Sequence, residues 1–296
     1  MKTFGFLLVV LICFSTNAMA AHIRGGELTY RYLGAGTAAG TSNYELTLKL
    51  YVDCSARGEG QLENTVSFTI FDKLTGQVNR ILGVSFSSEE WIRYDPNSNP
   101  CILNAPTDVC YRLRYYSTTV TLPDMPDGYT VAFQRCCRID NIRNVSGNSG
   151  DIGATYSCDI PGTKALASAP ANSSPKFNPN DAIAICVGTQ FTFDFSAVDQ
   201  DRDSLVYNLC NAFVGGGREP GSCFSCTSPA PASTPPFDQV SYSSGYGGSS
   251  PLGNNVTIDS KTGIISGIAP PSVGQYVVTV CVSEYQIGRA SCRERV

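Results

Sequence analysis

Two adjacent cysteines, Cys136 and Cys137, lie at the end of a predicted strand that begins at Gly128. A tight turn precedes the strand, and alternate positions carry the β-forming residues Tyr129, Val131 and Phe133. Successive strand side chains point to opposite faces of a sheet, so the two thiols are poorly placed to bond each other. We therefore expect a separate partner for each thiol, and a covalently braced β-scaffold.

Both ends of the chain are expected to lie outside the mature fold. Residues 1–20 have the pattern of a signal peptide, with a basic start, a short apolar run and the cleavage site Ala18-Met19-Ala20. Residues 287–296 match the in-frame translation of a sequencing adapter, and we interpret them as an artefact. We expect export from the cytoplasm and a natural protein that continues beyond Gln286.

The cysteine content and the charge narrow the class of protein. Cys13 and Cys292 belong to the two ends, so 11 of the 13 cysteines remain. In an exported chain, that number favours disulfides over metal binding. A net charge of −4 argues against a nucleic-acid partner. The mature part has no apolar run of about 18 residues, so no transmembrane segment is expected in it.

The hydrophobic pattern predicts an all-β protein with two consecutive disulfide-braced antiparallel β-sandwich (immunoglobulin-like) domains. The first domain covers 21–163, residues 164–180 form a linker, and the second domain covers 181–286. The second contains a long Gly/Pro/Ser-rich loop, and its first strand is predicted at 182–187. Seven strands are predicted in the first domain: 24–33, 44–54, 64–72, 79–86, 111–122, 128–140 and 153–160.

Several motifs together resemble one family: Ala21-His-Ile-Arg-Gly-Gly-Glu-Leu-Thr-Tyr30, Tyr51-Val-Asp-Cys54, Gln134-Arg-Cys-Cys-Arg138, Asp199-Gln-Asp-Arg-Asp-Ser-Leu-Val-Tyr207 and Val280-Cys-Val-Ser-Glu-Tyr285. In this order they are similar to the N-terminal region of large secreted surface proteins of gliding Bacteroidota. Such proteins usually end in a gliding-motility-associated C-terminal domain and leave the cell by the type IX system. The second domain is similar to immunoglobulin-like or cadherin-like repeats. The resemblance implies display at the cell surface.

The predicted disulfides involve ten cysteines: Cys54, Cys101, Cys110, Cys136, Cys137, Cys186, Cys210, Cys223, Cys226 and Cys281. Short spacing predicts local bonds for Cys101–Cys110 and Cys223–Cys226. We expect Cys54 to bond one member of the Cys136–Cys137 pair. Cys186–Cys281 is favoured within the second domain, and Cys158 is the candidate for the odd thiol.

Asp199, Asp201 and Asp203 form a candidate calcium site. Alternate acids in a turn can converge on Ca²⁺, which prefers several oxygen ligands. The alternative is a solvated acidic turn with Arg202 as its counter-charge. No other cofactor is expected.

The aromatic residues Trp91, Tyr94, Tyr115 and Tyr116 are a candidate sugar-binding platform, with packing in the core or at a sheet edge as the alternative. A catalytic site is harder to assemble from this sequence, because His22 is the only histidine and Glu89 and Glu90 should diverge on a strand. We therefore expect a secreted, non-catalytic adhesion or structural protein whose partners are surface glycans or proteins. A carbohydrate-binding module of a polysaccharide-utilisation protein is the alternative, and an enzyme comes third.

Overall fold

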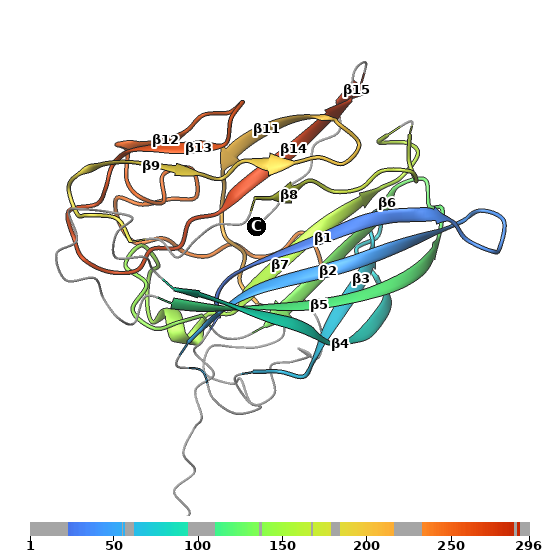
Figure 1. Cartoon of the computed structure of the whole chain (residues 1–296), viewed down its shortest axis with the longest axis horizontal. Helices are drawn as coiled ribbons and strands as arrows, with labels where there is room; N and C mark the ends of the chain where they lie inside the picture. Colours follow the sequence, from blue (N-terminus) through green and yellow to red (C-terminus); the bar gives the residue numbers. More distant parts are fainter. Residues whose placement is uncertain are drawn as a thin grey trace, which may run out of the picture.

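The computed structural model describes residues 23–54, 56, 62–93, 110–135, 138–166, 168–178, 184–215, 233–286 and 289–290. These residues form an all-β, antiparallel architecture, as the pattern predicts (Figure 1). The N-terminal half contains the strands β1 (Ile23–Ala35), β2 (Thr41–Asp53), β3 (Thr65–Asp72), β4 (Val78–Arg93), β5 (Cys110–Pro123), β6 (Gly128–Arg135) and β7 (Ala154–Pro161).

The seven strands form one sheet in the order β1-β2-β5-β4-β3-β6-β7, which is nearly closed into a barrel. β4 makes the corner. Its first half pairs with β3 up to Ser85, and its second half pairs with β5 from Phe86 onward, with a register shift between Phe86 and Ser88. Strands that change partner at a bend in this way join the two leaves of a folded sheet. The expected pair of separate sheets is thus replaced here by one continuous sheet.

The core lies between the two leaves. In β2 the predicted alternation is confirmed, because Leu46, Leu48, Leu50 and Val52 are all buried. Lys49, on the opposite face, is also buried, with 5% of its surface exposed. The core closes where β1 meets β7: a Cβ atom on Gly26 would come within 2.9 Å of the Tyr156 ring. Glycine therefore permits the close approach of these two strands.

The C-terminal half contains two three-stranded sheets. One has the order β12-β13-β9, from β9 (Gln190–Asp194), β12 (Val256–Ile258) and β13 (Ile264–Ile268). The other has the order β11-β14-β15, from β11 (Ser204–Leu209), β14 (Val280–Gln286) and β15 (Arg289–Ala290). Both contribute to one hydrophobic core: Tyr207, Leu209, Val256, Ile265, Val280 and Val282. Residues 184–187, predicted as part of a strand, form no strand here, because no neighbouring strand pairs with them.

The segment predicted as a linker lies along the free edge of β1. Ser174 donates its backbone N–H to the carbonyl of Tyr30 over 2.9 Å, and the Tyr30 N–H donates to Ser174 Oγ over 3.0 Å. Further on, β8 (Lys176–Phe177) pairs with β10 (Ala197–Val198). The two bonds from Ser174 satisfy backbone groups of Tyr30 that the open side of β1 would otherwise leave unpaired.

The two halves of the chain also share hydrophobic clusters. Phe71 and Ala132 of the seven-stranded sheet pack with Phe213 and Phe237. Arg138 is buried and donates to the carbonyl of Phe213 over 2.7 Å and to that of Gly153 over 3.1 Å. The described part of the predicted long loop therefore supplies core residues, among them Phe213, Phe237 and Val240. The expected domain boundaries stay a prediction.

Two disulfides correct the predicted pairings. Cys110 bonds Cys54, so the predicted Cys101–Cys110 bond and the predicted bond from Cys54 to Cys136 or Cys137 are wrong. The physical reason is that β2 and β5 are neighbours, with Asp53 opposite Tyr111, so the two cysteines meet at the end of this strand pair.

In the second half, Cys281 bonds Cys210, so the predicted Cys186–Cys281 bond is wrong. β11 and β14 pair directly, which brings these two sulfurs together. Cys186 is disulfide-bonded and Cys158 is a buried thiol. The predictions for Cys101, Cys136, Cys137, Cys223 and Cys226 lie outside the described residues.

Candidate binding surface on strands β4 and β5

The second half of β4 and the beginning of β5 place charged side chains on the inner face of the sheet. On β5, Arg112 and Arg114 have the same parity as the buried residues Tyr116, Val120 and Leu122. Across the strand pair, Glu89 lies opposite Arg114, and Trp91 lies opposite Arg112. The four side chains therefore share one face.

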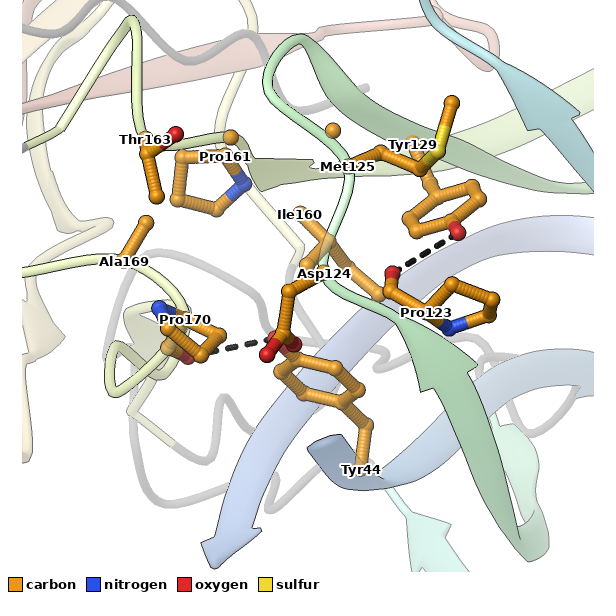
Figure 2. Close-up of a pocket in the computed structure, with 12 residues that line it drawn as sticks. Tyr44, Pro123, Asp124, Met125, Tyr129, Ile160, Pro161, Thr163, Ala169 and Pro170 are labelled. Carbon is orange, nitrogen blue, oxygen red and sulfur yellow. Dashed lines mark hydrogen bonds between the residues drawn. The ribbon is translucent and has the colours of Figure 1, made fainter. Parts of the chain in front are cut away.

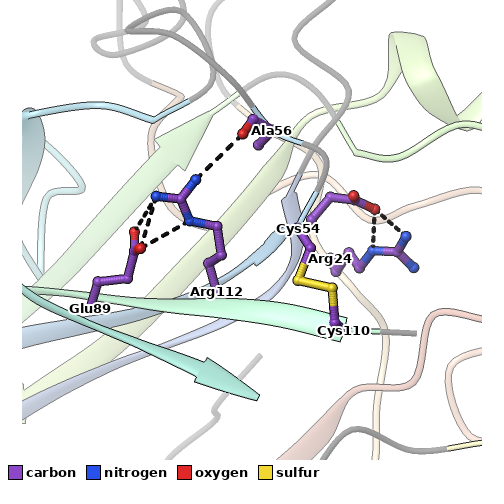
Figure 3. The surroundings of a disulfide bond; sticks show 7 residues. Arg24, Cys54, Ala56, Glu89, Cys110 and Arg112 are labelled. Atoms are coloured by element: carbon purple, nitrogen blue, oxygen red, sulfur yellow. Dashed lines mark hydrogen bonds and ion pairs between the residues drawn. A yellow bond between two sulfur atoms is a disulfide. The ribbon is translucent and has the colours of Figure 1, made fainter. Parts of the chain in front are cut away.

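Glu89 binds both arginines (Figure 3 shows its pairing with Arg112). Arg112 makes a bidentate contact, with Nε 3.0 Å from Oε1 and Nη2 2.9 Å from Oε2 of Glu89. Arg114 donates from Nη1 to Oε2 over 3.0 Å. Bidentate arginine–carboxylate pairs combine charge with fixed geometry, so the carboxylate holds two guanidinium groups in place.

Backbone carbonyls also bind the two arginines. Arg112 Nη1 donates to the Ala56 carbonyl over 3.4 Å. Arg114 Nη2 and the Tyr116 hydroxyl both donate to the carbonyl of Glu63, over 3.0 and 2.7 Å. Burial raises the pKa of the Tyr116 phenol, so the hydroxyl stays protonated and keeps its role as a donor. The Glu63 carboxylate forms a buried ion pair with Arg135. The network is therefore held in place by Glu63, which lies just before β3, and through Glu63 by Arg135 at the end of β6.

Aromatic rings cover the arginines on the solvent side. Trp91 is 48% exposed, and the guanidinium carbons of Arg112 and Arg93 lie 4.9 and 5.5 Å from its ring centre. Phe86 is 36% exposed, and Arg114 lies 4.2 Å from its centre. All three distances suit cation–π contacts. Arg93 makes no ion pair within the described part of the chain.

The Cys54–Cys110 disulfide closes this end of the sheet. Arg93, the last residue of β4, lies opposite Cys110, and the bond fixes Cys110 to the end of β2. Beside it, Arg24 Nε donates to Asp53 Oδ2 over 2.7 Å (Figure 3). The strand ends that carry Trp91 and Arg93 therefore belong to a covalently braced frame.

The predicted aromatic platform is assembled only in part. Trp91 is exposed, but Tyr116 is 1% exposed and belongs to the core. Tyr115 points to the opposite face of the sheet from Tyr116, because the two are successive strand residues. Tyr94 lies outside the described residues. Phe86, which was not predicted, lies on the same face as Trp91.

Glu89 and Glu90 diverge, as successive strand residues do. Glu89 is half-buried between two arginines, whereas Glu90 is exposed. Sequence reasoning missed the roles of Arg93, Arg112 and Arg114. The sequence places Arg112 and Arg114 two residues apart on one predicted strand, and Trp91 and Arg93 two residues apart further up the chain. This spacing indicates a shared face only when β4 and β5 are known to pair.

The acidic turn Asp199–Asp203 makes contacts within the protein. Asp199 Oδ1 accepts the backbone N–H of Asp203 over 2.9 Å. Asp201 Oδ2 accepts the backbone N–H of Ser173 over 2.6 Å, which ties the turn to the segment along β1. Among the described residues, no three His, Cys, Asp or Glu side chains come together as a metal-binding group. Calcium binding by Asp199, Asp201 and Asp203 stays a prediction.

A small pocket of about 230 Å³, part of it open to solvent, lies where β5 and β7 end and β6 begins (Figure 2). Polar groups on its wall already have partners: the Tyr44 hydroxyl donates to the Pro170 carbonyl over 3.2 Å, and the Tyr129 hydroxyl donates to the Pro123 carbonyl over 2.8 Å. Asp124 accepts from Ser42. These bonds hold adjoining turns together, and we assign the pocket a structural role.

His22, the only histidine, lies outside the described residues. No helix in the described ranges is long and apolar enough to cross a membrane. Comparison of the chain with known protein families, with curated proteins and with solved structures finds no match.

Proposed function

We propose that the chain is the N-terminal region of a secreted cell-surface protein with an adhesive or structural role, which binds partners without transforming them. We also propose that the C-terminal half folds as an immunoglobulin-like sandwich. The proposal that the chain belongs to the surface proteins of gliding Bacteroidota rests on the motifs quoted above.

The observation that carries the proposal is the bracing of one all-β frame. Disulfides join β2 to β5 and β11 to β14, and buried contacts tie the two halves together. Rigid β-frames with disulfides suit proteins outside the cytoplasm, where they resist unfolding and present a fixed surface. Exposed Trp91 favours a second candidate, a carbohydrate-binding module, because flat aromatic rings stack on sugar faces.

The test is a binding and turnover screen of the oxidised chain against cell surfaces, glycans, and simple ester, peptide and glycoside substrates. We expect binding without turnover, and digestion of the protein when protease is added to intact producing cells. Turnover that disappears in Glu89→Gln or Glu90→Gln would contradict the proposal.

A further inference from the structure

We propose that the surface formed by Trp91 and Arg93 binds acidic polysaccharides, with Trp91 against a sugar ring and Arg93 on the sugar carboxylate. This inference rests on the proposal that the chain binds its partners without transforming them, and it names the chemistry of one partner.

The charge of the surface favours an anion. Arg93, Arg112 and Arg114 carry three positive charges on this face, and Glu89 supplies one negative charge. Beneath them, the Glu63–Arg135 ion pair is neutral as a unit. The result is a local positive excess on a chain whose net charge is −4. Such an excess attracts carboxylated ligands.

The Trp91 ring is held in a fixed position before a ligand binds. Arg112 packs against the Trp91 ring and is itself fixed by three hydrogen bonds to Glu89 and one to the Ala56 carbonyl. A ring that is held in place before binding loses little side-chain entropy when the ligand arrives. With 48% of its surface exposed, Trp91 still offers apolar surface to a sugar.

Arg93 supplies the charge recognition. Arg112 and Arg114 already use their donors on Glu89 and on backbone carbonyls. Arg93 is exposed and stacks on the Trp91 ring, and among the described residues it pairs with no carboxylate. Residues two apart on a strand project from the same face about 7 Å from each other. A sugar on Trp91 can therefore place its carboxylate on the Arg93 guanidinium, whose geometry suits bidentate binding.

The test uses the fluorescence of Trp91, the only tryptophan in the chain, so the signal reports on this surface. The full oxidised chain is titrated with polygalacturonate, with its methyl ester, in which the carboxylates are uncharged, and with single-stranded DNA. The variants are Arg93→Gln and the matched control Arg80→Gln, an exposed arginine on the same strand. Affinity electrophoresis measures binding by Trp91→Ala, which lacks the reporter.

We expect a saturable fluorescence change with polygalacturonate, a Kd about tenfold higher in Arg93→Gln, and an unchanged Kd in Arg80→Gln. The methyl ester and DNA should bind much more weakly, and Trp91→Ala should lose retention. Equal binding of the ester or of DNA, equal weakening in Arg80→Gln, or no fluorescence change overturns the inference. Binding of the ester alone leaves the proposed function standing, whereas turnover of the polymer contradicts it.

Discussion

The side-chain amide of Asn144 makes two reciprocal hydrogen bonds with the backbone of Val277, 133 residues later in the chain. Nδ2 donates to the Val277 carbonyl over 2.7 Å, and Oδ1 accepts the Val277 N–H over 2.9 Å. A third bond, 2.8 Å long, joins Nδ2 to the Pro251 carbonyl. The amide thus takes the place of a neighbouring strand for Val277 and couples the N-terminal half of the chain to the C-terminal half.

Asn144→Ala should therefore lower the free energy of unfolding by about 3 kcal/mol, because three hydrogen bonds disappear and their partners stay buried. Chemical denaturation measures the loss. The control is Asn148→Ala, in the same segment: Asn148 is exposed and its side chain accepts the N–H of Gly150, so the cost should be about 1 kcal/mol. Equal losses in the two variants would contradict the coupling role of Asn144.

Removal of the Cys54–Cys110 disulfide by the double change Cys54→Ser and Cys110→Ser should destabilise the chain by about 4 kcal/mol, since the bond closes a loop with a sequence separation of 56. Equilibrium unfolding in denaturant, without reductant, checks the value. The matched control is Cys210→Ser with Cys281→Ser, whose separation is 71. We expect the first double variant alone to alter the fluorescence of Trp91, because Cys110 lies next to Arg93 across the strands.

How far the sequence predicts this fold depends on the hydrophobic alternation of each strand. Leu46, Leu48, Leu50 and Val52 identify β2 clearly, and all are buried. β4 was predicted to end at Phe86 but continues to Arg93, because the inward positions of its second half carry Glu89, Trp91 and Arg93 instead of aliphatic residues. Pairing with β5, and not local apolar pattern, extends the strand.

The disulfides and the binding surface depend on which strands are neighbours. Local spacing favoured Cys101 as the partner of Cys110, but the pairing of β2 with β5 places Cys54 beside it. In the same way, Arg112 reaches Glu89 and Trp91 only because β4 lies next to β5. Sequence order does not determine strand order, so neither contact could be read from spacing.

Stability should fall as the pH rises above 10. Burial raises the pKa of Tyr129 from 10.0 to about 12, and it also raises the pKa values of Tyr44 and Tyr51. The unfolded chain ionises these phenols near pH 10, while the folded chain keeps them neutral, so stability is full below pH 10 and is lost as the pH rises toward the folded pKa.

Denaturation at a series of alkaline pH values measures this slope. Each such tyrosine contributes at most about 1.4 kcal/mol per pH unit in that window, and less where solvent screens the phenolate. Tyr129→Phe should be less stable at neutral pH, because it loses the hydrogen bond to Pro123, but its pH slope should be shallower than that of the wild type. If the stability of Tyr129→Phe falls between pH 10 and about 12 as steeply as that of the wild type, Tyr129 is not a source of the pH dependence.

Asp201 should matter for stability even without a metal. Its carboxylate accepts the Ser173 N–H over 2.6 Å and so holds the segment that lies along β1. In the presence of a chelator, Asp201→Ala should lose about 1.5 to 3 kcal/mol, since a hydrogen bond to a charged group disappears. Asp201→Asn keeps an acceptor oxygen and should lose less.

Calcium should act on the same turn. If Asp199, Asp201 and Asp203 bind Ca²⁺ in the folded state alone, calcium at about 100 times Kd raises the free energy of unfolding by about 2.7 kcal/mol. Thermal melts with calcium, magnesium or chelator measure the rise, which we expect to be smaller with magnesium because its octahedral geometry fits the turn poorly. Asp203→Asn removes a carboxylate and leaves the Asp201–Ser173 bond in place, so it should abolish the calcium response. Melts of the wild type that ignore calcium up to millimolar concentrations would leave the turn as a solvated acidic loop that binds Ser173 and has Arg202 as its counter-charge.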